Sequence, residues 1–173
     1  TILPLKYYDI DAVILFSDIL LLPHCLGQKV TFKKGIGPLL QEIEITRDFL
    51  KENINPHDLE PIKNAIGSIR KIIPSTKDLI GFCGAPWTIS CYMIEGGSSR
   101  DYSKTRKFLW DDEKLFIKLI NKLTIDCVTF LEHRYLAGST VLMIFDSWSH
   151  MIPDRYWVQL GIEPTRLIIE KLR

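Results

Sequence analysis

The sequence lacks an excess of charge of either sign and has no long apolar run. Its 22 basic and 21 acidic residues leave a formal net charge of +1 at pH 7. No run of about five or more like charges occurs, so the composition argues against a nucleic-acid partner. No segment approaches the roughly 18 uninterrupted apolar residues of a membrane span, so we expect no membrane partner.

Closely spaced cysteines and nucleotide or hydrolase motifs are also lacking. The four cysteines show no C-x-x-C spacing and are too few to staple a chain of 173 residues, so we expect reduced thiols in a cytoplasmic protein. The four histidines show no i, i+4 pair, so we expect no bound metal. The segment "EGGSS" lacks the lysine of a Walker loop, and no G-x-S-x-G motif is present.

What the sequence does contain is three short, uniformly apolar runs, at Ala12–Phe16, Leu79–Phe82 and Thr140–Phe145. Strands that are buried on both faces of a parallel sheet require this pattern. Buried helix segments are the alternative, but the lengths of the runs and the flanking turn residues favour strands. The composition is that of an ordinary globular domain, with 46% apolar and 25% charged residues.

Amphipathic helices alternate with these strands. The spacing of apolar residues predicts helices over about Asp112–Leu136 and Pro61–Ile73, another from near Pro164, and a shorter one over about Arg100–Leu109. This order indicates βαβ units and a parallel sheet. The strands lie about twice as far apart as in a minimal unit of ~30 residues, so inserted structure is expected. The alternating segment around Val30, followed by the turn signal "GIGP", supplies part of it.

Each apolar run is followed at once by polar or conformationally special residues. These are "SD" at 17–18, "CGAPWT" at 83–88 and "DSWSH" at 146–150. Ligands of parallel α/β proteins bind outside the carboxyl ends of the strands, so the three segments are expected to lie close together. Asp18, and likewise Asp146 with Ser147, could instead cap a helix or lie in a loop, and the residue types alone favour that interpretation. The residues by themselves indicate a partial α/β barrel or a doubly wound sheet.

Three segments carry a resemblance to a known family. "DAVILFSDIL", "GFCGAPWTISCYMIEGG" and "VLMIFDSWS" resemble uroporphyrinogen decarboxylases in residue type, order and spacing. The combination "GAPWT…Y…EGG" is highly specific, and the resemblance covers the whole chain. It implies a (β/α)8 TIM barrel, usually a homodimer, of roughly twice this length. Residues 1–173 would then be a single partial TIM-barrel domain with about three parallel strands and their helices, the second to fourth β/α units.

The resemblance also implies an activity. Members of the family decarboxylate the four acetate side chains of uroporphyrinogen III stepwise, giving coproporphyrinogen III in haem biosynthesis, without a metal or an organic cofactor. The arginine-rich first motif and the second half of such a barrel do not occur in this sequence, so we expect the fragment alone to be an inactive piece of a carboxy-lyase. The alternative is a non-catalytic tetrapyrrole-binding or interaction protein of the same lineage.

Four site residues follow from matching positions. Asp18 in "FSDIL" resembles the catalytic aspartate that accepts hydrogen bonds from the pyrrole N–H groups of the substrate. Tyr92 resembles the tyrosine beside it, and Ser147 occupies the position of a hydroxyl that contacts the substrate. Phe82 resembles an aromatic residue that lines the cleft.

Three positions depart from the family pattern. Asp9 and His150 stand where relatives commonly have glycine, and Cys83 replaces a small residue. Of these, His150 is close enough in sequence to Ser147 to enter the site.

Overall fold

The three predicted strands form one parallel sheet in the order β1-β4-β5. The computed structural model describes residues 1–35 and 37–173, so Ile36, inside the predicted "GIGP" turn, lies outside the described residues. The strands are β1 (Ala12–Ile14), β4 (Asp78–Gly84) and β5 (Val141–Phe145). The parallel α/β prediction is confirmed, and the described strands form an open sheet of three rather than a closed barrel.

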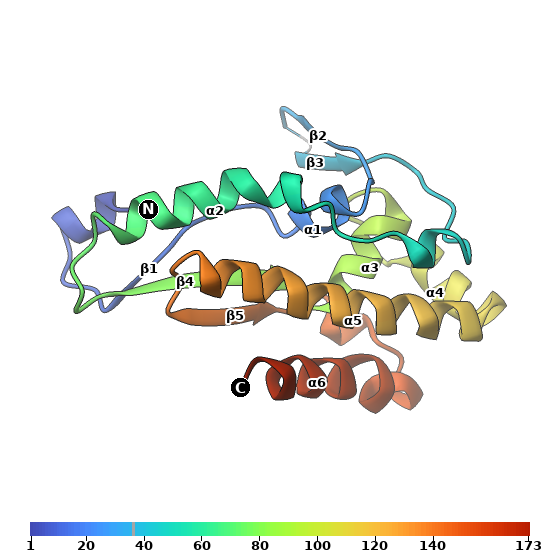
Figure 1. Cartoon of the computed structure of the whole chain (residues 1–173). Helices are drawn as coiled ribbons and strands as arrows, with labels where there is room; N and C mark the ends of the chain where they lie inside the picture. Colours follow the sequence, from blue (N-terminus) through green and yellow to red (C-terminus); the bar gives the residue numbers. More distant parts are fainter. Residues whose placement is uncertain (36) are drawn as a thin grey trace.

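Helices connect the strands and cover one face of the sheet (Figure 1). The α-helices are α1 (Leu21–Cys25), α2 (Pro56–Arg70), α3 (Pro86–Glu95), α4 (Ser103–Asp111), α5 (Glu113–Leu136) and α6 (Glu163–Leu172). Short helical turns are η1 (Leu3–Lys6), η2 (Phe49–Lys51), η3 (Ser149–Met151), η4 (Asp154–Tyr156) and the π-helical η5 (Trp157–Ile162). None of the helices in the described ranges is both long and apolar enough to cross a bilayer.

Local capping signals account for the starts of α2 and α5. The Asp112 side chain accepts a hydrogen bond from the Leu115 N–H at 3.0 Å, so α5 begins close to its predicted start. Helix α2 was predicted to start at Pro61 but begins at Pro56, because the Asn55 side chain caps it through the His57 N–H at 3.2 Å. Pro61 lies inside this helix.

The strand predictions need two corrections. The first strand ends at Ile14 rather than Phe16, because the chain leaves the sheet there, and Phe16 is 80% exposed. The prediction that β5 is buried on both faces is wrong, since Val141 and Met143 are 37% and 36% exposed. Helices α2 and α5 cover one face of the sheet; Val141 and Met143 lie on the other face of this edge strand, together with Phe145, which packs against Phe82.

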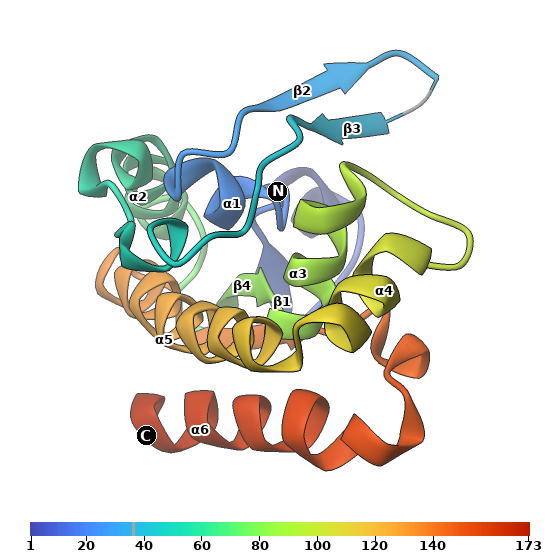
Figure 2. The same ribbon diagram turned by 90° about the vertical axis from the view of Figure 1, so that its right-hand side faces the viewer.

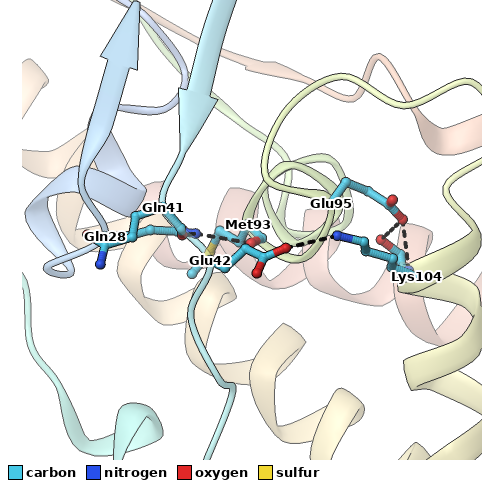
Figure 3. A network of polar contacts seen from close by, with 7 residues as sticks. Gln28, Gln41, Glu42, Met93, Glu95 and Lys104 are labelled. Carbon is cyan, nitrogen blue, oxygen red and sulfur yellow. Dashed lines mark hydrogen bonds and ion pairs between the residues drawn. The ribbon is translucent and has the colours of Figure 1, made fainter.

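The inserted segment after α1 is an antiparallel hairpin, at the place where the alternation around Val30 and the turn signal indicate inserted structure. It consists of β2 (Val30–Lys33) and β3 (Gly37–Leu40). Figure 2 shows the hairpin beside α1 and α3, on the opposite side of the sheet from α6. Side chains hold its base in place: Gln28 Nε2 donates hydrogen bonds to the carbonyls of Gln41 at 2.8 Å and Met93 at 3.0 Å (Figure 3). The hairpin is therefore fixed to α3, close to the strand ends.

Candidate active site

The carboxyl ends of the three strands surround a cavity of about 270 Å³. All four predicted site residues line this cavity: Asp18, Phe82, Tyr92 and Ser147. They come from the loop after β1, from β4, from α3 and from the loop after β5. Parallel pairing of the strands, with Val13 opposite Leu79 and Phe82 opposite Met143, brings these separate segments to one edge of the sheet.

Asp18 is half-buried and has two structural roles. Its Oδ1 accepts a hydrogen bond from the Leu20 N–H at 2.9 Å, and its carbonyl accepts one from the Leu21 N–H at 3.1 Å. The turn role that the residue type favours is therefore real. Within the described ranges, Oδ2 accepts no hydrogen bond from the protein, so this oxygen is available to a ligand.

A second cavity also borders Asp18. Its volume is about 340 Å³, and Asp18, His24 and Phe32 are among its lining residues. The hairpin strand β2 supplies Phe32, so the hairpin forms part of the surroundings of the carboxylate. Asp18 thus lines two cavities.

Aromatic side chains form much of the wall of the first cavity. The Phe82 ring meets the Phe145 ring edge to face, with 5.3 Å between the centroids, and Phe16 lies 6.4 Å from Phe82. Tyr92 packs 6.2 Å from Trp148. These rings give the cavity an apolar wall beside Asp18.

The second strand-end carboxylate, Asp146, does not line the cavity that contains Asp18. Its Oδ1 accepts a hydrogen bond from the Thr88 hydroxyl at 2.7 Å, and Thr88 Oγ1 accepts one from the Trp148 N–H at 3.1 Å. Burial raises the pKa of Asp146, and the hydrogen bond from Thr88 opposes that shift. Asp146 instead lines a separate cavity of about 570 Å³ against α6. The predicted closeness of the segments therefore holds for both residues, since Asp146 contacts Thr88 of the second segment, but only Ser147 shares the cavity that contains Asp18.

The three departures from the family pattern lie outside the cavity lining. Asp9 is exposed and pairs with Lys77 at 2.7 Å, which lowers the pKa of its carboxyl group. His150 lies near Trp148, with 6.1 Å between the ring centroids and the ring planes tilted by 55°. Cys83 is buried, and the three other cysteines are also buried and free.

The sequence interpretation missed Arg134, a buried residue of α5. Its Nη2 donates a hydrogen bond to the Ser17 hydroxyl at 2.8 Å, directly beside Asp18 in the chain. Its position four residues after Phe130, on the apolar face of the helix, was a signal that could have found it. Residues 1–35 and 37–173 contain no group of three side chains that could hold a metal ion.

Comparisons with known proteins identify the family of this chain. A family model described as uroporphyrinogen decarboxylase (URO-D) matches residues 1–173. The chain is 40% identical over 174 residues to the uroporphyrinogen decarboxylases of Rickettsia massiliae (strain Mtu5) and Rickettsia conorii (strain ATCC VR-613 / Malish 7), covering 100% of this chain and 50% of each relative. The corresponding protein of Rickettsia bellii (strain RML369-C) is 38% identical, with 51% of it covered. The chain thus spans about half the length of the curated relatives it matches.

A solved structure supports the fold. A methyltransferase from Methanosarcina mazei superposes with a TM-score of 0.76 over 94% of this chain and 49% of its own, at 16% sequence identity. At that identity the likeness concerns the fold alone. Together with the family match over its full length, these findings show that the chain belongs to the uroporphyrinogen decarboxylase family.

Proposed function

We propose that the natural protein containing this chain is a uroporphyrinogen decarboxylase, and that Asp18 is its central catalytic carboxylate. The observation that supports this most strongly is that Asp18, Phe82, Tyr92 and Ser147, from four separate segments, line one cavity. The family match and the curated relatives point to the same activity. In this proposal the complete protein is a (β/α)8 barrel that acts as a homodimer in the cytoplasm, and residues 1–173 form a single partial-barrel domain within it.

The chemistry requires a place for the electrons that the leaving carboxylate releases. A proton first adds to a ring carbon; the acetate side chain then loses its carboxylate as CO₂, and the electron pair of the broken C–C bond moves into the protonated ring. The methylene carbon takes up a second proton to become a methyl group, and the ring carbon releases the first proton, which restores the pyrrole. The positive charge on the ring develops near its nitrogen. An anionic carboxylate fixed beside that nitrogen stabilises this charge.

Asp18 suits this role because one carboxylate oxygen is held by a backbone hydrogen bond and the other is available to the substrate. The Leu20 N–H orients the carboxylate through Oδ1, leaving Oδ2 for the pyrrole N–H groups. Pyrrole donors also satisfy a carboxylate that is half-buried among apolar side chains. In this proposal Asp18 anchors the substrate and stabilises the transition state, and it does not donate the proton.

The other three residues complete the surroundings of the ring. Phe82, supported by Phe145, provides an apolar contact for a pyrrole face and limits water near Asp18. Tyr92 and Ser147 line the same cavity and carry hydroxyl groups that can donate hydrogen bonds to substrate carboxylates.

The test uses the full-length natural protein that contains this chain. Uroporphyrinogen III is incubated under reducing, anaerobic conditions, and the products are oxidised to porphyrins and separated by chromatography. We expect seven-, six-, five- and four-carboxylate products to appear in turn. A parallel fluorescence titration with coproporphyrin III measures binding. Binding without any loss of CO₂ would refute the enzyme and favour the alternative of a non-catalytic tetrapyrrole-binding protein.

A further inference from the structure

Arg134 lies near the end of α5 and is 2% exposed, so its guanidinium group is buried below the candidate active site. Burial lowers the pKa of this group to about 10, which keeps it a cation at neutral pH. No carboxylate in the described part of the chain forms an ion pair with it, and its Nε and Nη1 have no hydrogen-bond partner there. A buried, incompletely paired cation is unfavourable for folding, so stability does not explain this residue.

Two contacts of the Arg134 guanidinium group are with residues of the active-site cavity. Its Nη2 donates to the Ser17 hydroxyl at 2.8 Å, and its guanidinium carbon lies 5.3 Å from the centroid of the Phe82 ring. Both of these partners line the cavity that contains Asp18. The Phe130 ring, 4.5 Å from the same carbon, supports the guanidinium from within α5. One side chain thus links α5 to the loop after β1 and to the ring on β4.

The backbone of β4 leaves the space that Arg134 needs. A Cβ atom at Gly81 would lie 3.0 Å from Arg134 Cβ and 2.6 Å from Ser139 Oγ. A side chain at position 81 would therefore require Ser139, in the loop after α5, or Arg134 to shift. The close approach of helix and strand at this point lets the guanidinium group reach Ser17.

We propose that Arg134 is a positioning residue, which holds Ser17 and Phe82 so that the Asp18 carboxylate keeps its orientation toward the cavity. This inference rests on the proposed function of Asp18. Ser17 precedes Asp18 directly, so a change in the Ser17 backbone is passed to the carboxylate and to its hydrogen bond with Leu20. Displacements of about 1 Å in a catalytic group can lower turnover by roughly 100-fold.

The kinetic test compares Arg134→Met, Arg134→Lys and Ser17→Ala in the full-length protein. Methionine removes the donor and the charge, whereas lysine keeps both a donor and a charge. We expect Arg134→Met and Ser17→Ala each to lower kcat roughly tenfold or more with a smaller change in KM, because the group they displace acts in the transition state. The double variant is expected to be no slower than the slower single variant, and Arg134→Lys to recover part of the loss.

A matched control separates positioning from stability. Lys122→Met, on the same helix, breaks a buried ion pair with Asp126 whose atoms lie 2.8 Å apart, away from the cavity. It is expected to lower stability without lowering kcat per folded molecule. Losses in kcat that simply multiply in the Arg134→Met/Ser17→Ala double variant, or an unchanged kcat in Arg134→Met, would overturn the proposal.

A second measurement does not depend on catalysis. The Leu20 amide is protected by its hydrogen bond to Asp18 Oδ1, so hydrogen exchange at Leu20 reports the orientation of the carboxylate. We expect Leu20 to exchange faster in Arg134→Met and in Ser17→Ala, with the amides of β5 unchanged. Should the native protein show no decarboxylation, the proposed function fails, while this exchange rate still decides the role of Arg134. Unchanged exchange at Leu20 in both variants refutes it.

Discussion

Replacement of Asp18 by asparagine removes the charge of the proposed catalytic group and leaves its shape. The asparagine oxygen can still accept the Leu20 N–H, now 2.9 Å from Oδ1, so the turn into α1 is expected to persist. What is lost is the attraction between the carboxylate and the positive charge that develops on the pyrrole ring. The variant therefore tests electrostatic stabilisation with little effect on folding.

The size of the effect follows from the surroundings of Asp18. Opposite unit charges ~4 Å apart at an effective dielectric constant of about 20 attract each other by about 4 kcal/mol. Asp18 is half-buried, so water screens part of this interaction. A remaining contribution of about 2.7 kcal/mol corresponds to a 100-fold change in rate. We expect Asp18→Asn to reduce turnover of uroporphyrinogen III by about 100-fold or more.

The assay measures initial rates of decarboxylation in the full-length protein at saturating substrate, normalised to the folded fraction from circular dichroism. The matched control is Asp126→Asn, the same change at a buried carboxylate of α5 that pairs with Lys122 and does not line the cavity. This control is expected to keep its turnover per folded molecule. Turnover of Asp18→Asn within about threefold of the native value would refute the electrostatic role, since that corresponds to well under 1 kcal/mol.

Three further predictions concern stability. Gly81→Ala is expected to destabilise the full-length protein by about 1–3 kcal/mol, because the new Cβ would lie 2.6 Å from Ser139 Oγ. The control is Gly67→Ala inside α2, where the new Cβ would lie 3.8 Å from a carbonyl oxygen, and this variant is expected to stabilise the protein by about 0.5–1 kcal/mol. Equal urea midpoints for the two variants would contradict the packing explanation. Burial raises the pKa of the Asp126 carboxyl group in the folded state, and the neighbouring Lys122 opposes this rise. The Asp126 carboxyl group therefore stays protonated to a higher pH in the folded state than in the unfolded state. This difference in pKa stabilises the folded protein below about pH 4, and the stabilisation is lost as the pH rises through the native pKa. The free energy of unfolding in urea should therefore fall over this pH range in the native protein, and Asp126→Asn should remove that fall. The same pH dependence in Asp126→Asn would contradict the assignment to Asp126. Finally, β1 and β5 each have one unpaired edge in the described sheet, so the isolated 173-residue chain is expected to melt without a single cooperative transition, and a sharp calorimetric peak would count against this.

Much of the fold was predictable because its signals are local. The strands followed from short apolar runs, and α5 from its apolar periodicity and the Asp112 cap. The predicted start of α2 at Pro61 is five residues too late, because the Asn55 side chain caps the helix at Pro56 and Pro61 lies inside it. Burial of β5 was wrong because an apolar run does not show whether one or two faces of a strand are covered.

The candidate site was predictable only in part. The residue type of Asp18 favoured a turn, and the structure shows that turn, while the family resemblance supplied the reason for its place in a cavity. Asp146 had the same sequence context at a strand end, yet its carboxylate accepts a hydrogen bond from Thr88 and lines another cavity. Strand-end position alone therefore could not separate these two carboxylates.

By itself the sequence determined the order of strands and helices, the parallel sheet and the family, because each depends on residues a few positions apart or on motifs read directly from the chain. Only the tertiary structure decided which strand-end residues share a cavity. It also decided that Arg134, packed against Gly81, donates a hydrogen bond to Ser17. The physical reason is that these contacts join segments far apart in sequence. Their geometry depends on the twist of the sheet and on how closely α5 packs against β4, which no local pattern records.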